Sequence, residues 1–287
     1  MGQIIAVVSG KGGTGKTSFT ANVGMALAQM GYSTLCLDCD IGLRNLDIAL
    51  SMTDRAVMDF SDVITHRCTL AEAVAPHPTQ KNLYLLTAPS RISPAAVDPA
   101  AFRVLLSSIR IQYDYCLIDA PAGLGSGFRL ATAGADRAMV ITTTEASSLR
   151  DAQRTVMELQ HMPRGKLHLV VNRCRRKLLK SLHQTIDDAI DTAGLPLLGV
   201  ILRHYADEGQ ARLVHGVIDG GVHTVEHFSA NPVHYQMQRA GGEVAHFHDG
   251  VLRIPQGGRV CCGHHYGAVG GAGGQNKSGA KAGRSVQ

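Results

Sequence analysis

The residues best arranged for chemistry lie near the start of the chain, in Ser9-Gly10-Lys11-Gly12-Gly13-Thr14-Gly15-Lys16-Thr17-Ser18. They follow an apolar run and precede a helical pattern, and Gly10-x-x-x-x-Gly15-Lys16-Thr17 has the spacing of a P-loop. Glycines let backbone N–H groups surround phosphates, and the start of the next helix adds its positive end. Lys16 would reach the β- and γ-phosphates, and the Thr17 hydroxyl would bind Mg²⁺. A glycine-rich turn that matches by chance is the alternative, which the flanking elements disfavour.

Two further segments place carboxylates at the ends of apolar runs. Thr34–Leu37 leads into Asp38 and Asp40, and Tyr115–Ile118 leads into Asp119. The carboxyl ends of parallel strands are where such sheets bind ligands. We therefore expect one acid to hold hydrated Mg²⁺ and another to orient a water. Asp119 has the form of a Walker B acid. A helix cap or turn residue is the structural alternative for each Asp.

The elements that would position these residues alternate along the chain up to residue 201. Strand-length apolar runs are predicted at Ile4–Val8, Thr34–Leu37, Leu83–Thr87, Tyr115–Ile118, Ala138–Thr142, His168–Val171 and Leu197–Ile201. Helical spacing is predicted over Thr17–Gln29 before Gly31, Asp98–Ile111, Ser148–His161 and Leu178–Ala193 before Gly194. Apolar strands that alternate with helices predict an α/β fold with a doubly wound, mostly parallel sheet and helices on both faces.

The second lysine inside the loop makes the pattern more specific. Lys11 in Lys-Gly-Gly-x-Gly-Lys-Thr forms a deviant Walker A motif, and the sequence here resembles the ParA/MinD family of P-loop ATPases. The resemblance implies a SIMIBI-type P-loop fold, ATP and Mg²⁺ as cofactors, and hydrolysis to ADP and phosphate. It also implies that Lys11 reaches the nucleotide of a second copy in an ATP-bridged homodimer. A solvated loop lysine is the alternative.

The resemblance assigns roles to several further residues. It implies that Asp40 positions the hydrolytic water with Lys11 and Lys16 beside the phosphates, and that Asp38, Thr17 and Asp119 serve the metal. It also implies that Asn172 reads the adenine edge and that Arg173 covers the base. Thr142–Ala152 resembles a family segment near the dimer interface, which gives Glu145 and Asp151 an interface role. Read without the family, Ser147 or Ser148 is a helix N-cap and Asp151 a first-turn acid.

The string from Asp38 to Asp47 resembles the branch of this family that positions the cell-division site. That branch implies a division-inhibitor partner, a topological-specificity partner and the membrane surface. A ParA-type ATPase that moves DNA or other cargo, a flagellar-number ATPase and a nucleotide-binding adaptor with little turnover remain alternatives. The net charge of +5 is too diffuse to indicate nucleic acid as a partner.

Composition narrows the class of protein. No apolar run approaches the length of a membrane span, and the N-terminus lacks the pattern of a signal peptide, so we expect a cytoplasmic protein. Seven scattered Cys indicate free thiols in a reducing compartment. Cys36 and Cys39 have the spacing of a metal or redox pair, but no second pair completes such a site.

The resemblance extends over residues 1–201, which we expect to form the P-loop ATPase domain, and then ends. Residues 202–287 contain 9 of the 14 His and 17 of the 32 Gly, without a sustained helical or strand period. We expect an atypical, poorly ordered tail that is either frame-shifted or divergent. The family's basic amphipathic membrane helix is not found here, and peripheral attachment to the inner membrane requires its restoration. A cluster around Cys261, Cys262, His264 and His265, with His246 and His248, is a weak metal candidate.

Overall fold

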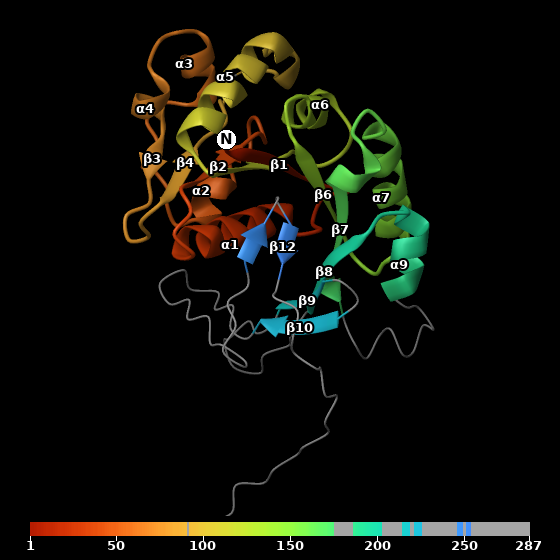
Figure 1. Cartoon of the computed structure of the whole chain (residues 1–287). Coiled ribbons are helices and arrows are strands. Elements are labelled where there is room, and N and C mark those ends of the chain that lie inside the picture. Colours follow the sequence, from red (N-terminus) through yellow and green to blue (C-terminus); the bar gives the residue numbers. More distant parts are fainter. Residues whose placement is uncertain are drawn as a thin grey trace, which may run out of the picture.

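The parallel sheet at the centre of the fold holds all seven predicted strands, in a computed structural model of the chain (Figure 1). The structure describes residues 1–90, 92–174 and 186–201, and the backbone of Leu202 and of 214–218, 221–225, 246–248 and 251–253. The parallel strands are β1 (Gln3–Val8), β2 (Thr34–Asp38), β4 (Leu83–Leu86), β5 (Tyr115–Asp119), β6 (Arg137–Thr142), β7 (Leu167–Cys174) and β8 (Leu197–Leu202). They lie in the order β8-β7-β6-β1-β5-β2-β4.

Helices cover both faces of this sheet, as predicted (Figure 1). The described α-helices are α1 (Lys16–Gln29), α2 (Leu46–Ala49), α3 (Phe60–Ile64), α4 (Leu70–Ala73), α5 (Pro99–Gln112), α6 (Ser126–Thr132), α7 (Ala146–Glu158) and α9 (Ile186–Ala193). Helices α1 and α2 pack on one face, whereas α5, α6, α7 and α9 pack on the other. Short 3₁₀ turns lie at Pro94–Ala96 and Arg164–Lys166. Of the predicted helix Leu178–Ala193, the part before Ile186 lies outside the described residues.

Side chains along β1 point alternately to the two faces of the sheet, so this one strand contributes to the cores on both faces. Ile4, Ala6 and Val8 belong to the cluster under α5, α6 and α7, while Ile5 and Val7 belong to the cluster under α1. All five are fully buried. A strand that is buried on both faces reads as a continuous apolar run, which is why the sequence predicts it so readily.

Local signals fix the ends of the long helices. Helix α1 ends at Gly31, where φ is +96° and the left-handed backbone favours glycine. Helix α5 begins with Pro99 after Asp98, whose carboxylate accepts the backbone N–H groups of Ala100 and Ala101. Helix α9 ends at Gly194, also with positive φ. No helix among the described residues is long and apolar enough to cross a bilayer.

Antiparallel strands extend the sheet at both edges and were not predicted. β3 (Ala75–Pro76) pairs with β4, and β9 (Val214–Ile218) pairs with β8 and with β10 (Gly221–Val225). A separate two-stranded sheet joins β11 (His246–His248) and β12 (Val251–Arg253). Short strands therefore follow residue 202, where none was predicted. The sequence Asp219-Gly220 between two runs rich in Val is a hairpin signal that was overlooked.

Candidate nucleotide-binding site

The P-loop joins β1 to α1, where its glycines and lysine are positioned by the backbone. Gly13 and Gly15 have φ of +76° and +92°, a left-handed conformation that residues with a Cβ rarely adopt. Lys16 begins α1, is only 7% exposed, and donates from Nζ to the Ser9 hydroxyl over 2.9 Å. The Oγ1 of Thr14 is buried without a hydrogen-bond partner in the described structure. The loop therefore presents a buried cation and an unpaired hydroxyl where phosphates are expected.

Thr17 and Asp119, the two residues predicted to hold Mg²⁺, lie together. The Thr17 hydroxyl donates to Oδ2 of Asp119 over 2.6 Å, and the Thr20 hydroxyl donates to Oδ1 over 3.3 Å. Burial raises the pKa of Asp119 to about 6, against the opposing effects of the Thr17 hydrogen bond and the Lys16 charge. A hydroxyl and a carboxylate are oxygen donors of the kind that Mg²⁺ prefers. The residues present therefore fit that ion.

Asp38 lies on β2 beside Asp119, since the register pairs the two residues. Its carboxylate accepts the backbone N–H of Asp40 over 2.8 Å and that of Leu46 over 3.2 Å. Burial raises the pKa of Asp38 to about 7. Both oxygens thus hold the loop between β2 and α2, and a role for Asp38 at the metal stays a prediction.

Asp40 is half-buried, and it forms one electrostatic group with Lys16 and Asp119. Burial raises the pKa of Asp40, and the charge of Lys16 opposes that rise. Burial lowers the pKa of Lys16, while the charges of Asp119 and Asp40 raise it. Lys16, Asp40 and Asp119 therefore influence one another's charge at the carboxyl end of the sheet.

Lys11 differs from Lys16 because it points to the surface. Its Nζ donates to the Ser147 hydroxyl over 3.1 Å and lies 3.5 Å from Oε2 of Glu145. Helix α7 begins at Ala146 with Glu145 as N-cap and without a side-chain capping hydrogen bond. The N-cap interpretation of Ser147 or Ser148 was therefore wrong: Ser147 binds Lys11, and Ser148 is buried inside the helix.

Asn172, predicted to read adenine, contacts the P-loop in this structure. Its Nδ2 donates to the carbonyl of Thr14 over 2.7 Å, and its Oδ1 accepts the N–H of Arg173 over 2.8 Å. A Cβ added to Gly15 would lie 2.4 Å from that Nδ2, so glycine is needed there for close approach as well as for φ. Arg173 follows with φ of +55°. The structure places both residues at the loop, and their adenine contacts stay predictions.

Sequence reasoning missed two polar residues of the site. Ser9 was read only as part of the motif, yet its hydroxyl accepts Lys16 and donates to the carbonyl of Lys11 over 2.7 Å. Thr20 was read only as a helix residue, although it contacts Asp119. The spacing of Thr20, one turn after Lys16 and on the same helix face, was the signal that could have identified it.

The buried cysteines Cys36, on β2, and Cys39, directly after it, do not form a reactive pair. Burial raises the pKa of the Cys36 thiol to about 12 and raises that of Cys39 well above its usual value. Thiols held in the neutral form are poor nucleophiles and poor metal ligands. Within the described residues, no group of three or more His, Cys, Asp or Glu side chains could hold a metal. The tail cluster from Cys261 to His265 lies outside those residues.

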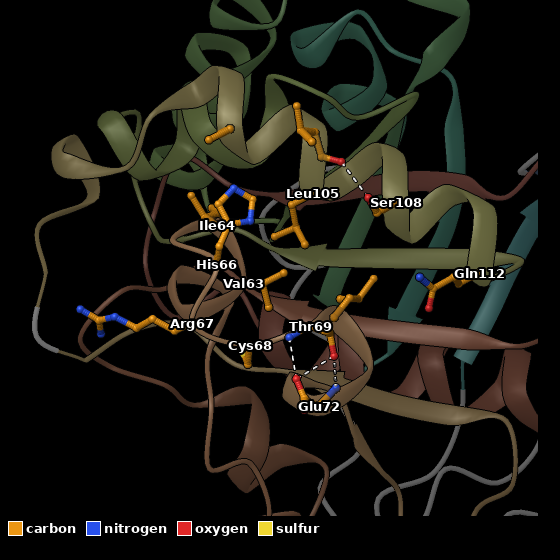
Figure 2. Close-up of a pocket in the computed structure, with 13 residues that line it drawn as sticks. Val63, Ile64, His66, Arg67, Cys68, Thr69, Glu72, Leu105, Ser108 and Gln112 are labelled. Carbon is orange, nitrogen blue, oxygen red and sulfur yellow. Dashed lines mark hydrogen bonds between the residues drawn. The ribbon is translucent and has the colours of Figure 1, made fainter.

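A cavity of about 670 Å³ lies between α3, α4 and α5 (Figure 2). Val63, Ile64, Val104 and Leu105 supply much of its apolar lining. Some of its polar groups are satisfied locally: Glu72 accepts the Thr69 N–H and hydroxyl, and Ser108 donates to a carbonyl of its own helix. None of the P-loop residues lines this cavity, so it is not the nucleotide site.

The doubly wound sheet, the P-loop at the end of β1 and the acids at the ends of β2 and β5 define a P-loop nucleotide-binding protein. The family described as an AAA domain matches residues 2–168, more than half of the chain. The septum site-determining protein MinD of Synechocystis is 40% identical over 203 residues, which cover 70% of this chain and 76% of the relative. MinD of Bacillus subtilis is 38% identical over 204 residues, with 70% and 76% covered.

Solved structures agree with these relatives. A MinC:MinD cell division complex of Aquifex aeolicus matches with 35% identity and a TM-score of 0.64 over 70% of this chain and 81% of that one. MinD from Pyrococcus horikoshii with Mg-ADP matches with 32% identity and a TM-score of 0.60, covering 70% and 82%. The chain belongs to the MinD family of P-loop proteins.

Proposed function

We propose that this protein is an ATP-dependent switch that positions the cell-division site, dimerises on ATP and resets by hydrolysing it to ADP and phosphate. The observation that carries the proposal is the arrangement at the carboxyl ends of β1 and β5. Buried Lys16 lies in the P-loop, and Thr17 is hydrogen-bonded to Asp119 beside it. Membership of the MinD family supports the biological role.

The proposed chemistry divides between the residues of the loop and the two acids. Backbone N–H groups of residues 10–18 and the Lys16 ammonium would bind the phosphates, and Thr17 with Asp119 would hold Mg²⁺, which neutralises developing charge on the phosphate oxygens. Asp40 would orient the attacking water. Asp38 would hold the Asp40 backbone in place through the hydrogen bond that it accepts.

Lys11 is the proposed dimer residue. Its ammonium is partly exposed, and its contacts within the chain are to the N-terminal end of α7. In the proposed dimer it would leave these contacts and reach the nucleotide of the second copy. Glu145, which loses its ion pair when Lys11 leaves, and Asp151 would lie near that interface. A division inhibitor is the proposed partner, supported by the MinC:MinD complex among the solved relatives.

The decisive experiment measures ATP turnover and ATP binding of Asp40→Ala. We expect turnover to fall at least 100-fold while ATP affinity changes less than threefold, because Asp40 orients water and does not hold the phosphates. Asp187→Ala, which removes a carboxylate from the exposed side of α9, is the matched control. Turnover that survives in Asp40→Ala would show that another group positions the water.

Two measurements separate this function from its alternatives. Asp40→Ala with ATP should sediment as a dimer, and adding Lys11→Ala should return it to a monomer. An adaptor with little turnover predicts ATP binding without phosphate release in the wild-type protein. A ParA-type DNA carrier predicts ATP-dependent binding to non-specific DNA that weakens steeply with salt, which we do not expect.

We propose a cytoplasmic location for the chain with its present tail. We propose also that residues 202–287 are a frame-shifted or divergent replacement of the family's C-terminal region. Sequencing the coding DNA around codon 201 and translating its three frames distinguishes a frame-shifted tail from a divergent one. A frame that restores a basic amphipathic helix would return the protein to the cytoplasmic face of the inner membrane.

A further inference from the structure

Helix α7 presses directly against the first glycine of the P-loop. A Cβ added to Gly10 would lie 2.5 Å from the carbonyl oxygen of Asp151 and 2.8 Å from Oγ1 of Thr155. Thr155 is fully buried, and its hydroxyl donates to that same Asp151 carbonyl over 2.7 Å. Gly10 therefore packs directly against the backbone of α7 and the Thr155 hydroxyl.

The two residues next to Gly10 in the chain, Ser9 and Lys11, also contact other parts of the site. The preceding residue, Ser9, accepts Lys16 Nζ on its hydroxyl over 2.9 Å and the N–H of Gly123 on its carbonyl over 3.3 Å. The following residue, Lys11, contacts Ser147 at the start of α7. A displacement of Gly10 would therefore also move Ser9, which contacts the phosphate-binding lysine and the segment after Asp119.

We propose that Thr155 is a positioning residue that sets the P-loop through Gly10, so that the position of α7 controls the hydrolytic site. This proposal rests on the proposed ATPase function for its effect on turnover. The contacts with Gly10 and the bond to Asp151 define the positioning itself. The physical basis is close packing: Gly10 has no side chain, so the loop backbone packs directly against α7, and two elements packed this closely cannot move independently.

The first measurement is amide hydrogen exchange of residues 9–16 in the nucleotide-free full-length protein. Thr155→Ala removes the hydroxyl beside Gly10 and its bond to the Asp151 carbonyl, and we expect exchange in this segment to increase at least tenfold. Thr155→Ser keeps the hydroxyl and should stay within threefold of the wild type. Thr132→Ala is the matched control, because Thr132 is 3% exposed and donates to the carbonyl four residues before it in α6, without touching the P-loop.

The second measurement is ATP turnover of the same variants. We expect kcat of Thr155→Ala to fall at least fivefold, with KM changed less than twofold, and kcat of Thr132→Ala to stay within twofold. Both alanine variants should lose thermal stability to a similar degree, which separates positioning from general destabilisation. Equal exchange of residues 9–16 in the two variants would overturn the proposal. If the wild-type protein has no turnover, the proposed function fails, while hydrogen exchange still decides the positioning role.

Discussion

The two edges of the parallel sheet bury charges in opposite ways. At the carboxyl edge, Asp38 and Asp119 are buried with pKa values raised to about 7 and about 6. At the amino edge, Asp136 accepts the Arg110 guanidinium with both oxygens at 2.7 Å, and it also accepts the backbone N–H of Ile4 over 2.8 Å. The first edge holds two buried acids whose pKa values are raised by burial, whereas the second holds an acid that accepts a guanidinium and a backbone N–H.

This difference shows how a ligand site can be told from a structural ion pair. A buried acid with a raised pKa costs folding free energy, which a bound cation would recover, so such acids are candidates for a ligand site. An acid that already accepts a guanidinium and a backbone N–H stabilises the fold by itself. The raised pKa values of Asp38 and Asp119 therefore favour the P-loop edge as the ligand site, in agreement with the motif.

Asp119→Asn should have the largest effect and should act in opposite directions on function and stability. Turnover with Mg-ATP should fall at least 100-fold, because the metal loses a carboxylate. Stability without nucleotide should rise by about 2 kcal/mol at pH 7.5, since an amide removes the cost of burying a charge near Thr17 and Thr20. Urea unfolding and steady-state turnover check the two effects.

The sign of the pH dependence follows from the raised pKa of Asp119. The native protein keeps this proton up to about pH 6, whereas the unfolded chain loses it near 3.8. The free energy of unfolding should therefore fall as pH rises between these values, and the fall should be smaller in Asp119→Asn. Equal pH profiles of variant and wild type would contradict the assignment.

Asp136→Ala should lower stability by about 1–3 kcal/mol and leave turnover per folded molecule within twofold. The substitution leaves the Arg110 guanidinium and the Ile4 N–H without their acceptor in a half-buried position. Urea unfolding measures the loss, with Asp187→Ala as a surface control that should change stability by less than about 0.5 kcal/mol. A large loss of turnover would show that the amino edge also serves the site.

Arg137→Met tests whether every buried polar group at the amino edge has a partner. Arg137 is 7% exposed, and its Nε has no hydrogen-bond partner in the described structure; the Oε1 of Gln3, on the same edge, is likewise unpaired. Replacing a buried cation whose Nε is unpaired with an apolar side chain of similar length should raise stability by about 1 kcal/mol. Thermal unfolding checks this, and a fall of more than 1 kcal/mol would reveal a partner for Arg137.

The strands and long helices could be predicted because their signals are local. Strands buried on both faces read as apolar runs, and Asp98 with Pro99 marked the start of α5. The short helices α3 and α4 lack room for a helical period and were missed. Their capping boxes, Asp59 with Asp62 and Thr69 with Glu72, were the available signals.

The site was predictable where one motif contains the chemistry and not where distant segments meet. Thr17 and Asp119 each belong to a recognisable pattern, and they are in contact. The contact of Asn172 with the P-loop depends on β7 lying two strands from β1, which no spacing in the sequence encodes. The same holds for Thr155, because it contacts Gly10 only when α7 packs against the P-loop.

The contact between Lys11 and Glu145 is too weak to hold Lys11 permanently in place. The side chains of Lys11 and Glu145 are 43% and 69% exposed, and exposed pairs of this kind contribute less than about 1 kcal/mol. That corresponds to less than about a fivefold excess of docked over free lysine. Rotamer exchange at the surface takes nanoseconds, far faster than two proteins meet. A fraction of the chains therefore has a free Lys11 at any moment, and formation of the proposed dimer need not wait for its release.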